Sequence, residues 1–201
     1  MSNIAERPQT CCEGPHSFDS RRVRDSCWPE ELQCLLIGES PGPPGADYFY
    51  DSVPDNARDP IVVRRHLLPG LVATGLLNSP TIEALCAAGF GFDHAIRCQL
   101  PTATIKHEYK LARRYASPRA HAATHLAELV GAARKVWILG HIARDAVTHV
   151  CGLQDRRPRI TPPYILPEDP RIFVSQYFRR FDSPSAVREI IAQFKAFFAA
   201  S

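Results

Sequence analysis

Short, mostly apolar runs recur along the chain, and each run stops abruptly at a glycine or a polar loop. Four of them predict buried strands, at residues 34–37, 94–98, 136–139 and 171–175. Apolar runs without strict alternation are typical of strands in a parallel sheet that is covered on both faces. The pattern therefore favours a central parallel sheet.

Between these runs, apolar residues recur at helical spacing. The expected helices cover residues 60–77, 80–88, 119–133, 142–150 and a last segment with Ser183 as N-cap and Pro184 in its first turn. Alternating strands and helices predict an α/β fold, a three-layer α/β/α sandwich with a central, mainly parallel, four-stranded sheet. We expect residues 1–30 to form an arm packed on the domain and residues 31–201 to form that domain.

The composition agrees with one domain. The 201 residues suffice for one sizeable core, since 45% of them are hydrophobic and 22% are charged. No stretch approaches the roughly 20 consecutive apolar residues of a membrane-spanning helix, so we expect a cytoplasmic monomer without a membrane partner. Seven cysteines, an odd number, do not indicate a disulfide framework. A net charge of +3 neither demands nor excludes a nucleic acid partner.

The loops that follow the predicted strands should meet at one edge of the sheet, because ligands of such sheets bind beyond the carboxyl ends of the strands. The first of these loops, residues 38–42, reads Gly-Glu-Ser-Pro-Gly and fits the nucleophile elbow of serine hydrolases. Pro41, however, has no N–H to serve as an oxyanion donor, and Pro43 and Pro44 prevent the helix that should follow. A serine hydrolase of small esters is thus a remote alternative.

The same loop resembles the first active-site motif of uracil-DNA glycosylases, in the branch that carries Gly-Glu-Ala-Pro-Gly. Residues 94–101 resemble the strand of that branch with its Asn, basic residue, Cys and Pro, and residues 136–143 resemble its strand, glycine and following helix. Residues 173–177 stand where the family has a second signature, His-Pro. The resemblance covers about residues 33 to 198 and implies a DNA repair enzyme. It would flip uracil, or another deaminated base, out of DNA and hydrolyse the N-glycosidic bond, leaving an abasic site.

Two departures from the family pattern change what the resemblance implies. Iron-sulfur members have four cysteines, of which Cys98 matches the third, but no cysteine follows within the next fifty residues. We therefore expect no cluster and no other cofactor or metal. The signature histidine is also missing, and Ser175 and Gln176 stand near its place.

Cleaving the bond between base and deoxyribose gives the sugar oxocarbenium character, so a carboxylate near the sugar and a held water are needed. Glu39 is the predicted catalytic carboxylate, and the alternative is that it only ties its loop together. Ser40 occupies the place where the most active branch has a catalytic Asp. Its hydroxyl can position water but stabilises positive charge poorly.

Four residues are predicted to bind the flipped base. Tyr48 and Phe49 would supply a flat apolar platform for it, although aromatic side chains in this loop could equally pack on the core. His94 matches the base-reading Asn of the family, with a core or surface histidine as the alternative. Gln176, beside the place of the missing histidine, is the fourth candidate.

Phosphate contacts are expected from cationic side chains and from the start of a helix. The candidates are Gly140 and His141, which open the helix after the third strand, and Arg179 and Arg180. Further arginines near the same loops, at residues 113–114 and 156–159, could bind phosphate or be ordinary solvated surface. The expected partner is DNA containing uracil or another deaminated base. The main alternative is a protein of the same fold that binds damaged or single-stranded DNA without cleaving it.

Overall fold

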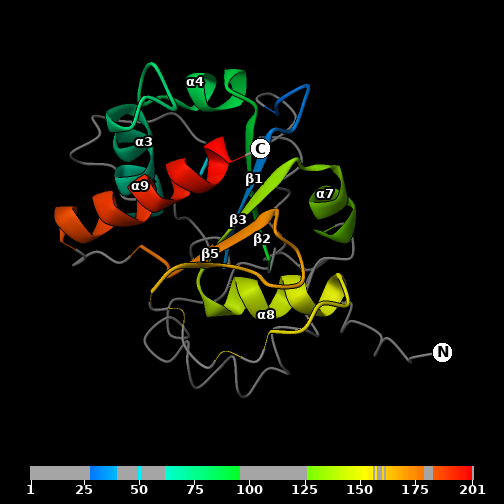
Figure 1. Cartoon of the computed structure of the whole chain (residues 1–201). Coiled ribbons are helices and arrows are strands. Elements are labelled where there is room, and N and C mark those ends of the chain that lie inside the picture. Colours follow the sequence, from blue (N-terminus) through cyan, green and yellow to red (C-terminus); the bar gives the residue numbers. More distant parts are fainter. Residues whose placement is uncertain are drawn as a thin grey trace, which may run out of the picture.

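The computed structural model describes residues 28–39, 49–50, 62–95, 126–155, 157, 160, 162–178 and 183–200. Its centre is a five-stranded sheet with the order β2-β1-β3-β5-β4 (Figure 1). The strands are β1 (Cys34–Gly38), β2 (Phe90–His94), β3 (Lys135–Leu139), β4 (Tyr164–Ile165) and β5 (Ile172–Ser175). All neighbouring strands are parallel except β4, which pairs antiparallel with β5.

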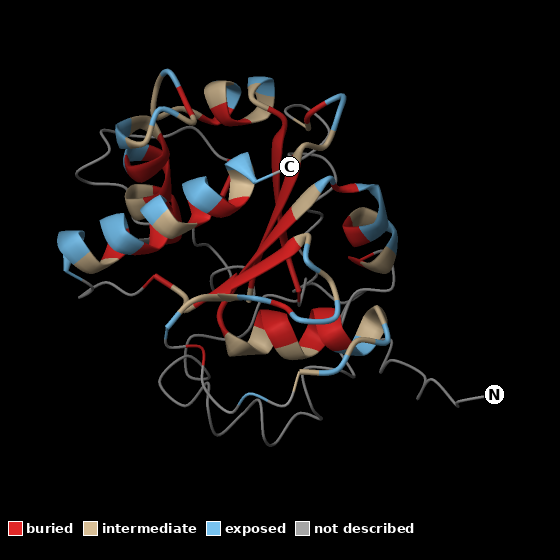
Figure 2. Ribbon diagram, viewed as in Figure 1, coloured by how far each residue is buried: buried red, intermediate tan, exposed pale blue. Residues whose placement is uncertain are grey.

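Helices pack against both faces of the sheet. They are α3 (Val62–Ala73), α4 (Ile82–Ala87), α7 (Leu126–Ala132), α8 (His141–Val150) and α9 (Pro184–Ala199). Helices α3, α4 and α9 share one apolar cluster with Leu36 and Trp137, whereas α7 and α8 share a second cluster with Ile37 and Ile138. Since successive strand residues face opposite sides, the clusters lie on opposite faces. Figure 2 shows buried strands between the helices, with exposed residues along the outer sides of α7 and α9.

The predicted α/β fold with a mainly parallel sheet is confirmed, but the sheet has five strands, not four. The additional strand, β4, is two residues long and lies at the edge of the sheet, paired with Val174 and Phe173 of β5. It follows Pro162 and Pro163, so the sequence around it indicates a loop. Pairing with a distant strand, rather than local preference, makes it extended.

The position predicted for the second strand is wrong. We expected residues 94–98, whereas β2 spans Phe90–His94, and residues 96–98 lie outside the described residues. Gly91 and Asp93 are poor strand formers, which hid the strand. Packing explains Gly91, because a Cβ there would lie 2.7 Å from Cη2 of Trp28. The correction moves His94 from the start of a strand to its carboxyl end.

The other predicted elements agree with the structure to within a few residues at their ends. Helix α9 begins where its cap predicts, since the Ser183 hydroxyl accepts a hydrogen bond of 3.2 Å from the Ala186 N–H and Pro184 is its first residue. Helix α7 begins at Leu126, and residues 119–125 of the predicted helix lie outside the described residues.

Only the last part of the predicted N-terminal arm is described. Residues 1–27 lie outside the described residues, and Trp28 packs against the apolar clusters on both faces. Among the helices that the structure describes, none is long and apolar enough to cross a membrane.

Candidate functional site

Four parallel strands end along one side of the sheet, which we call the carboxyl edge. It consists of Gly38–Glu39 after β1, His94–Ala95 at the end of β2, Gly140–His141 after β3 and residues 175–177 at the end of β5. Backbone hydrogen bonds join these segments. The Ala95 N–H donates to the Gly38 carbonyl over 2.9 Å, and the Gly140 N–H donates to the Ser175 carbonyl over 2.8 Å. The predicted site residues from four strands are thus neighbours.

The Glu39 carboxylate lies directly against Gly140 at the start of α8. Gly140 has a φ of 94°, and a Cβ at this position would lie 2.4 Å from Oε1 of Glu39. Any side chain at residue 140 would therefore displace the carboxylate, and the positive φ also disfavours one. The position suits an anion, because the first N–H groups of a helix and its dipole both attract negative charge.

His141 is the second neighbour of this carboxylate. Its Nδ1 lies 4.0 Å from Oε1 of Glu39, and the two side chains are 38% and 20% exposed. A protonated His141 would form an ion pair with Glu39, while a neutral one would leave the carboxylate charge for another cation. Glu39 is thus fixed by its surroundings yet still reachable by solvent. This arrangement suits both the catalytic role and the alternative of a loop tie.

His94 points from the end of β2 towards the first strand. Its side chain lies beside Gly38, where a Cβ would be 3.4 Å from Cδ2 of the imidazole. The ring packs edge-on against Phe92, with centroids 5.0 Å apart, and the residue is only 5% exposed. His94 therefore adjoins the loop of Glu39. Its base-reading role stays a prediction.

Phe49 lies in the core next to the carboxyl edge. Its ring stacks on Phe92 with centroids 3.9 Å apart, and it is 2% exposed. Two contacts fix this segment. The Tyr50 hydroxyl donates to the Phe92 carbonyl and accepts from the Phe92 N–H, and the buried Arg64 donates to the Phe49 carbonyl. One face of the Phe49 ring is therefore occupied by Phe92, and stacking of a base on its other face stays a prediction.

The Ser175 hydroxyl is taken up by hydrogen bonds in the core. The residue is fully buried, and its hydroxyl accepts a hydrogen bond of 2.8 Å from Nε1 of Trp137 and donates to the Gln176 carbonyl. Gln176, which follows it, is half-buried at the carboxyl edge. Of the remaining predicted site residues, Ser40, Tyr48, Arg179 and Arg180 lie outside the described residues.

The sequence analysis missed a polar cluster beside the first turn of α8. The guanidinium of Arg144, a buried residue, contacts Asp145 and lies 3.8 Å from the carboxylate of Asp155. Burial opposes the charge of Arg144, but hydrogen bonds with Tyr164 and Asp145 raise its pKa above the ordinary value. Burial and the hydrogen bond with Asp155 raise the pKa of Tyr164. The members of the cluster are nine or more residues apart in sequence, except for the neighbours Arg144 and Asp145, so no local pattern indicates the cluster.

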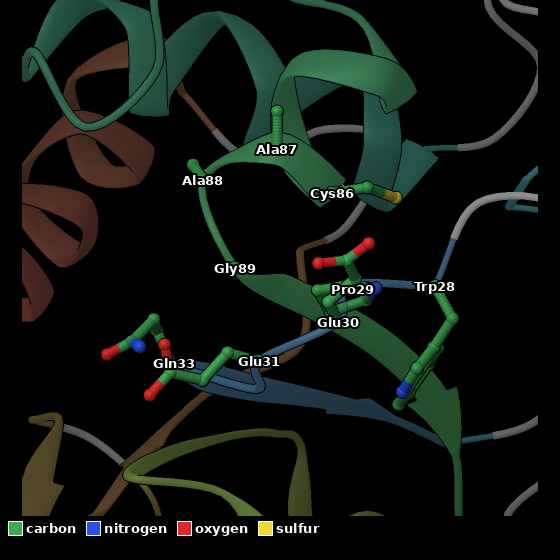
Figure 3. Close-up of a pocket in the computed structure, with 9 residues that line it drawn as sticks. All are labelled: Trp28, Pro29, Glu30, Glu31, Gln33, Cys86, Ala87, Ala88 and Gly89. Atoms are coloured by element: carbon green, nitrogen blue, oxygen red, sulfur yellow. The ribbon is translucent and has the colours of Figure 1, made fainter.

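A cavity of about 510 Å³ lies at the opposite side of the sheet, which we call the amino edge (Figure 3). It is lined by residues that precede β1 and β2, including Glu30, Glu31, Gln33 and Cys86. None of the predicted site residues lines it. In the described part of the chain, no three His, Cys, Asp or Glu side chains are grouped so that they could hold a metal ion.

No protein-family model and no curated protein sequence matches this chain. The functional argument therefore depends on the residues of the carboxyl edge themselves.

Proposed function

We propose that the protein is a DNA repair glycosylase that flips uracil, or another deaminated base, out of DNA and hydrolyses its N-glycosidic bond. The observation that carries the proposal is the Glu39 carboxylate, which is held against Gly140 at the start of α8 and remains partly exposed. The order of motifs along the chain supports it, as does the meeting of those predicted site residues that the structure describes at the carboxyl edge. With helices on both faces, we infer the three-layer sandwich that the alternation of strands and helices predicts.

In this reaction, the bond between C1′ of the sugar and the base nitrogen breaks, and its electron pair leaves with the base. Water forms the new bond to C1′, and its proton passes to the Glu39 carboxylate or to the departing base anion. Glu39 stabilises the positive charge on the sugar or orients the water, and Ser40 assists in holding that water. The fixed position of the carboxylate is an advantage, because a preorganised charge needs no rearrangement during the reaction.

The remaining candidates bind the substrate. His94, with Gln176, contacts the edge of the flipped base, and Tyr48 and Phe49 give it an apolar surface. The backbone N–H groups of Gly140 and His141 at the start of α8, with Arg179 and Arg180, bind phosphates of the DNA backbone.

The test is incubation of the protein with oligonucleotides that each contain one deaminated base, followed by alkaline cleavage at abasic sites. Cleavage at one or more of these bases, and none in the undamaged oligonucleotide, is the expected result. A panel containing uracil and hypoxanthine in single- and double-stranded form identifies the substrate. Absence of abasic sites across the panel would overturn the enzymatic proposal.

The second candidate function is binding of damaged or single-stranded DNA without cleavage. It is favoured by Ser175, whose buried hydroxyl bonds Trp137 where the family has its signature histidine. This candidate requires tight binding to a damaged oligonucleotide in the same preparation that releases no base.

A further inference from the structure

Residue 157 is fixed at three points although it lies in a loop. Its N–H donates to Oδ1 of Asp155 over 3.0 Å, and its carbonyl accepts a hydrogen bond of 2.7 Å from Nη1 of Arg144. Its guanidinium lies over the ring of Tyr164, with 4.0 Å between the guanidinium carbon and the ring centroid. An exposed arginine side chain is normally mobile, so this fixation needs an explanation.

The groups that fix Arg157 are interconnected: Tyr164 is half-buried, and the charged side chains are buried. The Tyr164 hydroxyl donates to Oδ2 of Asp155, and the side chains of Asp155 and Arg144 are 3% and 8% exposed. Burying a charged pair of this kind stabilises a fold little, compared with apolar residues of the same size. Its clearest effect is therefore to hold the loop in one conformation.

The cluster lies at the carboxyl edge, as two independent placements show. Arg144 is in the first turn of α8, directly after the Gly140 that contacts Glu39, and Tyr164 pairs with Val174 next to the carboxyl end of β5. Figure 1 shows the described segment 162–171, which leads into β5, running beside this helix. Arg157 thus belongs to the same side of the molecule as the proposed catalytic carboxylate.

The charge of Arg157 is available to an external anion. Among the described residues, the neighbouring carboxylates bond other groups: Asp155 accepts from the Arg157 backbone and from Tyr164, and Asp145 accepts from Arg144. The Arg157 guanidinium contacts the aromatic ring of Tyr164, and the residue is exposed. A ring beneath a guanidinium fixes its plane and leaves its N–H groups for a phosphate.

We propose that Arg157 binds a phosphate of the DNA backbone and that Arg144, Asp155 and Tyr164 are positioning residues that hold it for this contact. The inference rests on the proposed function for the identity of its partner. For Arg157 the sequence left phosphate binding and ordinary solvated surface open, and the cluster that fixes its side chain favours phosphate binding.

The first experiment measures binding of an undamaged duplex to the wild type and to Arg157→Gln over a range of salt concentrations. Loss of one phosphate contact should reduce the slope of log affinity against log salt by about 0.9, and affinity in about 0.1 M salt should fall by about fivefold to tenfold. Arg134→Gln is the matched control, because Arg134 is an exposed arginine at the amino edge. An unchanged slope for Arg157→Gln would overturn the proposal.

The second experiment tests the positioning role through a double-mutant cycle. Tyr164→Leu, which removes the ring under the guanidinium, should reproduce most of the affinity loss of Arg157→Gln and add little to it in the double variant. Tyr164→Phe retains the ring and should keep more affinity than Tyr164→Leu. Equal losses from Tyr164→Leu in both backgrounds would show that the tyrosine acts independently of Arg157, and the positioning role would be wrong.

The two proposals fail in distinguishable ways. If the wild type releases no base but Arg157→Gln shows a smaller salt dependence of DNA binding, the proposed DNA contact is supported and the proposed enzymatic function is wrong. If the wild type releases uracil but Arg157→Gln binds DNA with unchanged affinity and salt dependence, the enzymatic function is supported and the proposed Arg157 contact is wrong.

Discussion

The two edges of the sheet differ in what they offer a ligand. The amino edge has the cavity, about 510 Å³, lined by the exposed Glu30 and Glu31 and by small residues at the end of α4 (Figure 3). The carboxyl edge has Glu39, His94 and His141 packed around two glycines, Gly38 and Gly140. Among the described residues, this cavity thus lies at one edge and the predicted reactive side chains lie at the other.

This difference follows from the direction of the strands. At the carboxyl edge, each parallel strand leads into a loop that can carry a reactive side chain, and the helix that follows presents its N-terminus there. At the amino edge, the described contacts fasten elements together: Arg171 pairs with Asp169 and bonds the Ala133 carbonyl, and Lys135 bonds the Ala200 carbonyl. The cavity alone would therefore be a poor guide to function, and variants at the two edges should behave differently.

The largest effect is expected from Glu39→Gln, which keeps the volume of the side chain but removes its charge. Single-turnover base release at saturating DNA should fall by a factor of about 100 or more, with little change in DNA affinity, because the charge acts on the transition state. Glu31→Gln at the amino edge is the control and should release base at the wild-type rate. Normal base release by Glu39→Gln, combined with a lower melting temperature, would show that Glu39 only stabilises its loop.

Gly140→Ala tests whether the position of the carboxylate matters. Its Cβ would meet Oε1 of Glu39 at 2.4 Å, so base release should fall by about tenfold or more through misplacement of that group. Gly75→Ala separates this effect from backbone strain, since Gly75 has a φ of 76° and no atom within 4 Å of an added Cβ. Both variants should lose about 1–2 kcal/mol of stability from the positive φ. Equal activity of the two would show that the contact with Glu39 has no catalytic importance.

Parts of the fold could be predicted because their causes are local. The apolar runs of β1 and β3 and the cap at Ser183 are each visible in a few adjacent residues. The strand β2 could not be placed correctly, because Gly91 is explained by Trp28 and the backbone of the buried Phe92 is bonded by Tyr50, both remote in sequence.

The candidate site shows the same limit. Glu39 could be selected from its motif, and its place at the end of a strand brings it to the carboxyl edge. The steric requirement for Gly140 and the positioning cluster around Arg144 depend on contacts between separate elements, and no spacing in the sequence encodes them.

Ser175→Ala should mainly affect stability. The buried Nε1–H of Trp137 would lose its acceptor, and an unsatisfied buried donor costs about 1–3 kcal/mol. Base release by the folded variant should stay at the wild-type rate, because the hydroxyl is occupied in the core. Chemical denaturation and the oligonucleotide assay measure the two properties separately. A large loss of base release without a loss of stability would instead place Ser175 in the reaction.

The smallest effect is expected at the amino edge, from Asp169→Asn. Burial alone would raise the pKa of Asp169, but hydrogen bonds from the side chain and backbone of Arg171 outweigh it and hold the pKa below its ordinary value. A carboxyl group whose pKa is lowered by folding stabilises the protein above its unfolded pKa of about 3.9, and this contribution disappears as the pH falls through the folded pKa.

At neutral pH, Asp169→Asn should therefore melt below the wild type by an amount equivalent to less than about 1 kcal/mol, since solvent screens the pair. The difference should shrink as the pH falls below about 4, and Glu189→Gln, on the exposed side of α9, is the matched carboxylate variant measured beside it. Melting curves of the three proteins between neutral pH and about pH 3 measure this, and a difference that grows in acid would mean that the Asp169–Arg171 pair does not fasten this edge.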